Sequence, residues 1–194
     1  MSPKRRRAPG VLQFKITLEG TDPPVWRRVL VPEEVTLHGL HRIVQILMQW
    51  YDYHLYEFEI RGKRYEAPDP EAEGVDSTQV RLLDLGFEPG ERFTYRYDFG
   101  DDWVLELVVE KRTARKRDQW LPWVLEGERA APPEDCGGVW GFARFLEALT
   151  DRMHEEHQQV IDWAGEDYDP DRFDRRSVNH FVIMASAWGA LEGD

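Results

Sequence analysis

The amino-acid sequence predicts an α+β fold: a mainly antiparallel sheet in the first two thirds, covered by helices that include a C-terminal helical region. Three observations support this prediction. Apolar residues mostly follow the two-residue period of strands up to about residue 125, whereas helical spacing prevails from residue 137 onward. Separate runs of strands and helices favour an antiparallel sheet with helices packed on it over an alternating parallel sheet.

The third observation is a predicted β-hairpin at residues 92–110. Aromatic and aliphatic residues alternate with polar residues along both arms, which is the pattern of a hairpin with one buried face. The turn between the arms, Phe99-Gly100-Asp101-Asp102, is rich in turn-forming residues. It gathers Asp98, Asp101 and Asp102 beside aromatic residues, including Trp103. This is the densest concentration of chemically active groups in the chain.

The remaining elements follow from the same two periodicities. Residues 1–10 are predicted to form a disordered basic tail, and 11–190 a single α+β domain. Strands are expected over 11–19, 25–31, 53–60 and 64–66. Helices are expected over 37–50, from Gly137-Gly138 to about 150, over 154–164 and over 175–188, with Thr36 and Asp174 as N-caps of the first and last. Loops are expected over 67–77 and 126–135, and a basic connector after Lys111.

Composition narrows the classes of function. The formal net charge of −12 disfavours general nucleic-acid binding, because the phosphate backbone repels an acidic surface. Two basic segments, residues 4–7 and 111–117, are the exceptions. The single cysteine, Cys136, excludes an internal disulfide and suits a reducing cytoplasm. No apolar run is long enough to span a membrane, so we expect a cytoplasmic protein without a membrane partner.

Several segments resemble one protein family. They are VWRRVLVPEEVTLHGLHRIVQ, WYDYHLYEF, FTYRYDFGDDWVLELVVE, GERAAPPEDCGGVWGFARFL and DPDRFDRRSVN, in that order between about residues 12 and 180. The combination of DFGDDW with PPEDCGG resembles the plasmid "open reading frame three" proteins, named from a root-inducing pRiA-type plasmid. Related proteins are known as the passenger protein of an insertion element. The resemblance implies a cytoplasmic α+β domain found on plasmids, mobile elements and chromosomes, and it assigns no reaction or substrate.

The resemblance has two limits. The resolvase label sometimes given to the passenger protein does not carry over, because these residues contain neither a serine-recombinase nor a tyrosine-recombinase pattern. The family also tends to place a histidine two positions after the tryptophan of DFGDDW, where this chain has Leu105. If that histidine belonged to a metal or acid–base site in relatives, this chain lacks it.

The acidic turn is a candidate metal site. Asp98, Asp101 and Asp102 are proposed ligands of a divalent cation, with Glu106, His54 or Asp135 completing the shell. Oxygen-rich clusters suit Mg²⁺, Mn²⁺ or Ca²⁺, and a cation would relieve the repulsion between crowded carboxylates. The alternative is a solvated acidic turn, because Asp and Gly form turns without any metal.

Two further side chains are candidates for the same site. His54 shares a predicted strand face with Tyr56 and Phe58, so it is either a buried core histidine or a ligand and general base. Cys136 precedes Gly137-Gly138 at a predicted helix start, where the helix dipole would favour a thiolate. The adjacent Glu134 and Asp135 would oppose that thiolate, and the glycines alone explain a tight turn.

Three functions remain open at this point. The first is a non-enzymatic binding module, in which an acidic–aromatic cleft with Asp98, Asp101, Asp102, Trp103, His54, Asp135 and Cys136 engages a protein or a small cationic ligand. The second is a metal-dependent hydrolase, acting for example on phosphodiesters, with a metal-bound water as nucleophile. The third is a nucleic-acid accessory protein. The first two require the segment around Cys136 to lie close to the acidic turn.

Overall fold

The computed structural model describes residues 9–69, 73–165, 167–189 and 191. Most of the predicted basic tail, residues 1–8 with the cationic segment 4–7, lies outside the described residues. Gly10 already belongs to the first strand. Among the described residues, no helix is long and apolar enough to cross a membrane.

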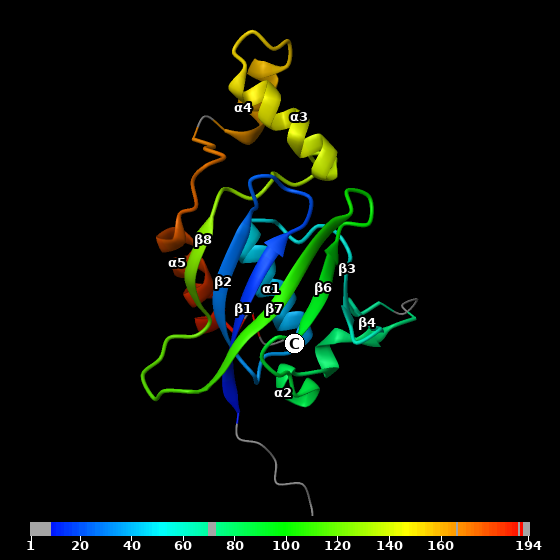
Figure 1. The fold of residues 1–194 in the computed structure, drawn as a ribbon, viewed down its shortest axis with the longest axis vertical. Coiled ribbons are helices and arrows are strands. Elements are labelled where there is room, and N and C mark those ends of the chain that lie inside the picture. The colour runs from blue at the N-terminus through cyan, green and yellow to red at the C-terminus, as the bar shows by residue number, and fades with distance from the viewer. Residues whose placement is uncertain (1–8, 70–72, 166, 190, 192–194) are drawn as a thin grey trace, which may run out of the picture.

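The fold is α+β, as predicted, and is built on one eight-stranded sheet (Figure 1). The strands lie in the order β5-β4-β3-β6-β7-β1-β2-β8, and neighbours are antiparallel except for β4 and β5. Their bounds are β1 Gly10–Leu18, β2 Trp26–Pro32, β3 Tyr56–Ile60, β4 Lys63–Glu66, β5 Val75–Asp76, β6 Arg92–Tyr97, β7 Trp103–Ala114 and β8 Trp123–Glu128.

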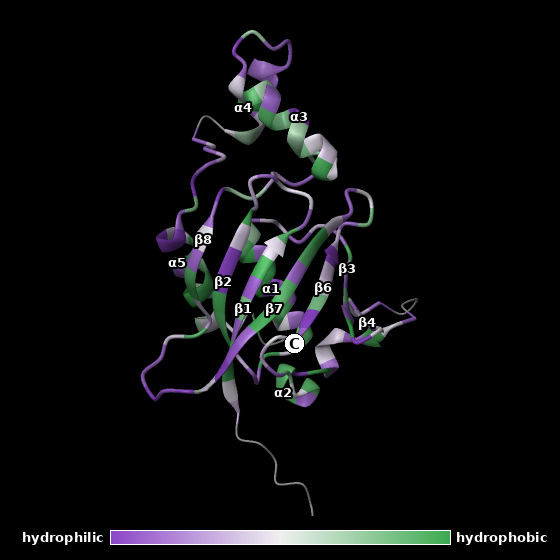
Figure 2. Ribbon diagram, viewed as in Figure 1, coloured by the Kyte–Doolittle hydropathy of each residue, from purple (hydrophilic) through white to green (hydrophobic). Residues whose placement is uncertain are grey.

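Alternation along the strands gives the sheet one buried face and one open face. Inward side chains such as Phe14, Tyr95 and Leu107 are fully buried. The open face carries ion pairs between neighbouring strands, for example Arg92 of β6 with Glu106 of β7 at 2.7 Å. Figure 2 shows the corresponding change between hydrophobic and hydrophilic residues along the strands. This is the pattern expected when helices cover only one side of an antiparallel sheet.

Helix α1 (Leu37–Met48) covers the buried face, and the predicted cap is present, since Thr36 Oγ1 accepts a hydrogen bond from Gly39 N at 3.0 Å. Helix α5 (Arg175–Ala187) packs beside β8 and α1, and Asp174 caps it as predicted. Helices α3 (Gly138–Thr150) and α4 (His157–Ala164) pair with each other beyond the end of the sheet (Figure 1). A short 3₁₀ turn, Ser77–Gln79, and helix α2 (Leu82–Leu85) lie between β5 and β6.

Several boundaries differ from the predictions: the helix predicted over 154–164 begins at His157, and the helix predicted over 37–50 ends at Met48. Strand β3 begins at Tyr56, so His54 lies in a bend before the strand. The predicted loop at 67–77 contains the short strand β5. Strand β7 continues through Ala114, because β1 pairs with it as far as that residue and turns the predicted basic connector into strand. Strand β8 extends to Glu128, inside the predicted loop 126–135, because its backbone pairs with β2. Tertiary pairing decided these last two boundaries, and local composition cannot report it.

Candidate functional site

The acidic bend between β6 and β7 is locked by its own carboxylate. Asp98 has φ 54° and Asp102 has φ 55°, a left-handed conformation that Asp tolerates better than most residues. Asp98 Oδ1 accepts a hydrogen bond from Gly100 N at 2.9 Å, and Asp102 N donates to Asp98 O at 2.7 Å. Asp98 is 7% exposed, so its side chain is almost completely enclosed. The bend is therefore a fixed structure and not a loose acidic loop.

The start of helix α3 rests on this bend. Asp101 Oδ2 accepts a hydrogen bond from Gly137 N at 3.0 Å. A Cβ atom at Gly138 would lie 2.3 Å from Asp101 O, so only glycine allows the two backbones to come this close, and Gly138 also has φ 66°. The prediction that the hairpin 92–110 lies next to the Cys136 segment is confirmed.

One histidine and two carboxylates converge at this junction. His54 Nε2 donates to Asp135 Oδ1 at 3.0 Å and lies 3.6 Å from Asp98 Oδ2. One donor atom from each residue lies within 4.8 Å of the other two. The side chains of His54 and Asp135 are 31% and 65% exposed, so the group, which we call the His54 cluster, is open to solvent on one side. Imidazole and carboxylate are donors that divalent metal ions accept.

The other predicted ligands point elsewhere. Asp102 pairs with Arg96, and Asp101 holds Gly137, so the set Asp98, Asp101 and Asp102 does not form one site among the described residues. Trp103, predicted to line the cleft, is fully buried in the core. Leu105 is also fully buried, so a histidine at that position would lie in the core and not in the His54 cluster.

The loop between α1 and β3, residues 49–55, borders the cluster and is fixed at several points. Trp50 Nε1 donates to Pro132 O at 3.0 Å, and Tyr51 N donates to Glu134 at 2.6 Å. Tyr53 N donates to Tyr97 Oη at 3.0 Å. The Tyr97 hydroxyl in turn donates to Glu134; burial, together with this contact, raises the pKa of Tyr97.

This loop presents aromatic rings that the sequence analysis did not single out. Tyr51 and Tyr53 are 72% and 73% exposed, and their rings stack with centroids 5.7 Å apart. Phe99, in the acidic bend, is 47% exposed. The available signal was the WYDYHLYEF segment, in which Tyr51 and Tyr53 have the opposite parity to Tyr56 and Phe58 and therefore could not join the buried face.

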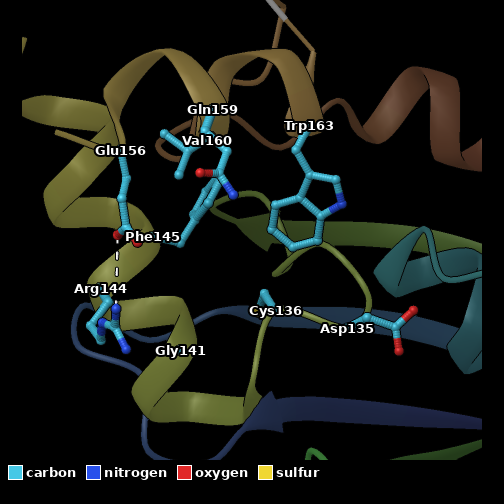
Figure 3. Close-up of a pocket in the computed structure, with 9 residues that line it drawn as sticks. All are labelled: Asp135, Cys136, Gly141, Arg144, Phe145, Glu156, Gln159, Val160 and Trp163. Carbon is cyan, nitrogen blue, oxygen red and sulfur yellow. Dashed lines mark ion pairs between the residues drawn. The ribbon is translucent and has the colours of Figure 1, made fainter.

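Cys136 faces a separate pocket. This cavity of about 390 Å³ lies between the Asp135–Cys136 segment and helices α3 and α4. Figure 3 shows the Cys136 side chain directed into it below Trp163, while the Asp135 carboxylate points away. Burial, with the nearby charges of Asp101 and Asp135, raises the pKa of Cys136 to about 12. The thiol is therefore protonated at neutral pH, which does not support a nucleophilic role.

A second histidine–carboxylate pair lies inside the fold. His41 is fully buried in α1; its Nε2 donates to Asp52 Oδ1 at 2.8 Å, and its Nδ1 lies 2.7 Å from Tyr95 Oη. Gln45 Nε2 donates to the same Tyr95 oxygen at 2.9 Å. Burial lowers the pKa of His41 despite the nearby Asp52. We call these groups the His41 network, and its members satisfy one another's hydrogen bonds.

The basic segment 111–117 is partly neutralised within the fold. Arg112 pairs with the buried Glu33 at 2.7 Å, and Arg115 lies 3.4 Å from Glu34. These two cations already have carboxylate partners, which weakens the case for a phosphate-binding arm.

Comparison with known proteins places the chain in a family. The model of the family described as plasmid pRiA4b ORF-3-like protein matches residues 10–177. An uncharacterised protein, y4hQ, from Sinorhizobium fredii is 39% identical over 183 residues, which cover 92% of this chain and 94% of the relative. The crystal structure of MM3350 from Methanosarcina mazei Go1, a protein of unknown function, is similar with a TM-score of 0.79 and 38% identity, covering 87% of this chain and 97% of that one. This chain therefore belongs to the plasmid pRiA4b ORF-3-like protein family.

Proposed function

We propose that this chain is a binding module that engages a cationic side chain of a partner protein at an acidic–aromatic surface. The surface consists of the exposed rings of Tyr51 and Tyr53, in the loop that also carries His54, together with the His54 cluster. The observation that carries the proposal is the stacked, exposed pair Tyr51–Tyr53 in the loop that also carries His54, whose imidazole contacts Asp98 and Asp135. Large rings that remain this exposed commonly mark interaction surfaces.

The chemistry of the surface suits a lysine or arginine side chain. A cation over an aromatic ring gains about 0.5–2 kcal/mol, depending on how far it is removed from water. Asp135 and Asp98 would supply the opposite charge, and Asp135 is exposed enough to be reached. The net charge of −12 would draw cationic partners toward the molecule. The combination of rings and carboxylates therefore favours a basic peptide segment as the ligand.

The test uses a fluorescein-labelled tetra-arginine peptide, followed by fluorescence anisotropy, with a tetra-glutamate peptide as the negative probe. We expect Tyr53→Ala and Asp98→Asn each to weaken tetra-arginine binding about tenfold. The first variant loses the contact with one aromatic ring, and the second loses the contact with one negative charge. Trp188→Ala removes an exposed ring, and Glu155→Gln an exposed carboxylate, elsewhere in the chain. If these two controls weaken binding as much as the site variants, the peptide is attracted by the overall charge of the protein and not by this surface, and the proposal fails.

A metal-dependent hydrolase is the second candidate function, and one observation favours it. The three donors of the His54 cluster, open on one side, would leave coordination positions for a water molecule on a bound metal. Mn²⁺-dependent hydrolysis of bis(4-nitrophenyl) phosphate that is lost in Asp98→Asn would identify this activity. A rate equal to that of metal in buffer alone would exclude it for this substrate.

A further inference from the structure

We propose that His54, Asp98 and Asp135 bind one divalent transition-metal ion, with Zn²⁺ the best match. The proposal goes beyond the function above, because it concerns the free chain and needs no partner. It replaces the sequence-based ligand set, in which Asp101 and Asp102 were included.

The donors have the right chemistry and spacing. They come from separate segments: the loop before β3, the β6–β7 bend and the segment before α3. His54 Nε2 lies 3.0 Å from Asp135 Oδ1 and 3.6 Å from Asp98 Oδ2. Ligands of a tetrahedral ion bound at about 2.0–2.2 Å lie about 3.4 Å from one another. Small side-chain rotations would therefore place all three atoms around one ion.

Asp98 carries an oxygen without a hydrogen bond. Its side chain is 10% exposed, and Oδ1 is used by Gly100 N. Within the described part of the chain, Oδ2 accepts no hydrogen bond and has only the longer 3.6 Å contact with His54. Oδ2 is therefore available to a bound cation, on the side of the carboxylate that faces His54.

The fold holds these ligands in place before any ion binds. Asp98 N donates to Leu55 O at 3.0 Å, which ties the bend to the residue after His54. The bond from Gly137 N to Asp101 Oδ2 ties the Asp135 segment to the same bend. Asp101 is therefore a positioning residue: it holds one ligand-bearing segment against another without contacting the ion. Such supporting contacts commonly change metal affinity by about tenfold to a hundredfold when they are removed.

The local charge also favours a cation. Arg96, on the adjacent strand, is paired with Asp102 and Glu57 and does not contact Asp98 or Asp135 in the described structure. One imidazole with two carboxylates suits Zn²⁺ or Mn²⁺ better than the all-oxygen sites preferred by Ca²⁺. Binding would displace the proton that His54 Nε2 now donates to Asp135.

The test is isothermal titration of the chelator-treated full chain with Zn²⁺ and, separately, Mn²⁺. We expect one Zn²⁺ site that is weakened more than about tenfold in His54→Ala and in Asp98→Asn, and less strongly in Asp101→Asn. His180→Ala and Glu155→Gln serve as matched controls, because they remove an exposed imidazole and an exposed carboxylate elsewhere. Circular dichroism must show that each variant is folded.

The outcomes separate this proposal from the proposed function. Absence of a Zn²⁺ site, or a site that is weakened equally by the control variants, overturns the metal proposal. Tetra-arginine binding to the metal-free chain would still support the binding module in that case. Zn²⁺ binding lost in His54→Ala, without any tetra-arginine binding, would support the metal site and overturn the binding module. Co²⁺ absorption bands that disappear in His54→Ala would identify the imidazole as a ligand directly.

Discussion

The His41 network and the His54 cluster each join a histidine to an aspartate, and both use the 49–55 loop, yet they differ in every other respect. His41 is fully buried; its two ring nitrogens contact Asp52 and Tyr95. The His54 side chain is 31% exposed and faces two carboxylates that it cannot both satisfy. Buried polar groups with complete hydrogen bonding give stability and a unique packing. Exposed groups with incomplete hydrogen bonding are available for ligands, and on this basis we propose a structural role for the His41 network and a binding role for the His54 cluster.

The largest expected effect tests the two histidines against each other. His41→Ala should lower the free energy of unfolding by about 2–4 kcal/mol, because it leaves Asp52 and Tyr95 short of a partner and opens a cavity where His41 stacks on Tyr56. His54→Ala should change it by less than about 0.5 kcal/mol, as exposed side chains commonly do. Urea unfolding followed by circular dichroism measures both. Equal losses in the two variants would contradict the division of roles.

The two aspartates give a smaller, matched comparison. Asp52 and Asp98 have φ values of 62° and 54°, which Asn also tolerates, so Asp→Asn changes charge with little change in backbone strain. Asp52→Asn should cost about 1 kcal/mol by weakening the bond to His41. Asp98→Asn should cost less than about 0.5 kcal/mol, because it relieves repulsion with Asp135. Thermal unfolding decides the order, and a larger loss at Asp98 would reverse our assignment.

The smallest expected effect is on the pH dependence of stability. Burial lowers the pKa values of His41 and His38 in the folded chain below 6.5. The unfolded chain therefore binds more protons below pH 6.5, and stability falls as the pH decreases from that value toward the folded pKa values. Urea unfolding between pH 5 and 8 should show this loss in the wild type and in His54→Gln. If the pH dependence of stability disappears in His54→Gln, His41 and His38 are not its source, and the prediction is wrong.

Much of the fold was predictable because local pattern and tertiary structure agree. The alternation in 92–110 became β6 and β7, and Thr36 and Asp174 cap the predicted helices. Two of the wrong boundaries have a common cause. Strand β8 extends to Glu128 and β7 to Ala114 because distant strands pair with them, and no local pattern records those pairings.

The candidate site was predictable in its location but not in its membership. Asp98, His54, Asp135 and the Cys136 segment do meet at one junction. Which carboxylates converge depends on side-chain direction in a left-handed bend, and neighbouring aspartates such as Asp101 and Asp102 can point to opposite sides of it. The burial of Trp103 was predictable, because it has the same parity as Leu105 and Leu107 on the apolar face of the hairpin; its position beside the acidic turn made it a candidate for the cleft instead.

The anchoring of the 49–55 loop has a consequence for recognition kinetics. Four consecutive residues of this loop are each held by a contact to a residue outside it: Trp50, Tyr51, Asp52 and Tyr53. Their backbone has already lost its conformational freedom before a ligand arrives, so association should proceed as the docking of a preorganised surface. The remaining entropic cost falls on the ring rotations of Tyr51 and Tyr53, which have only two side-chain torsions each.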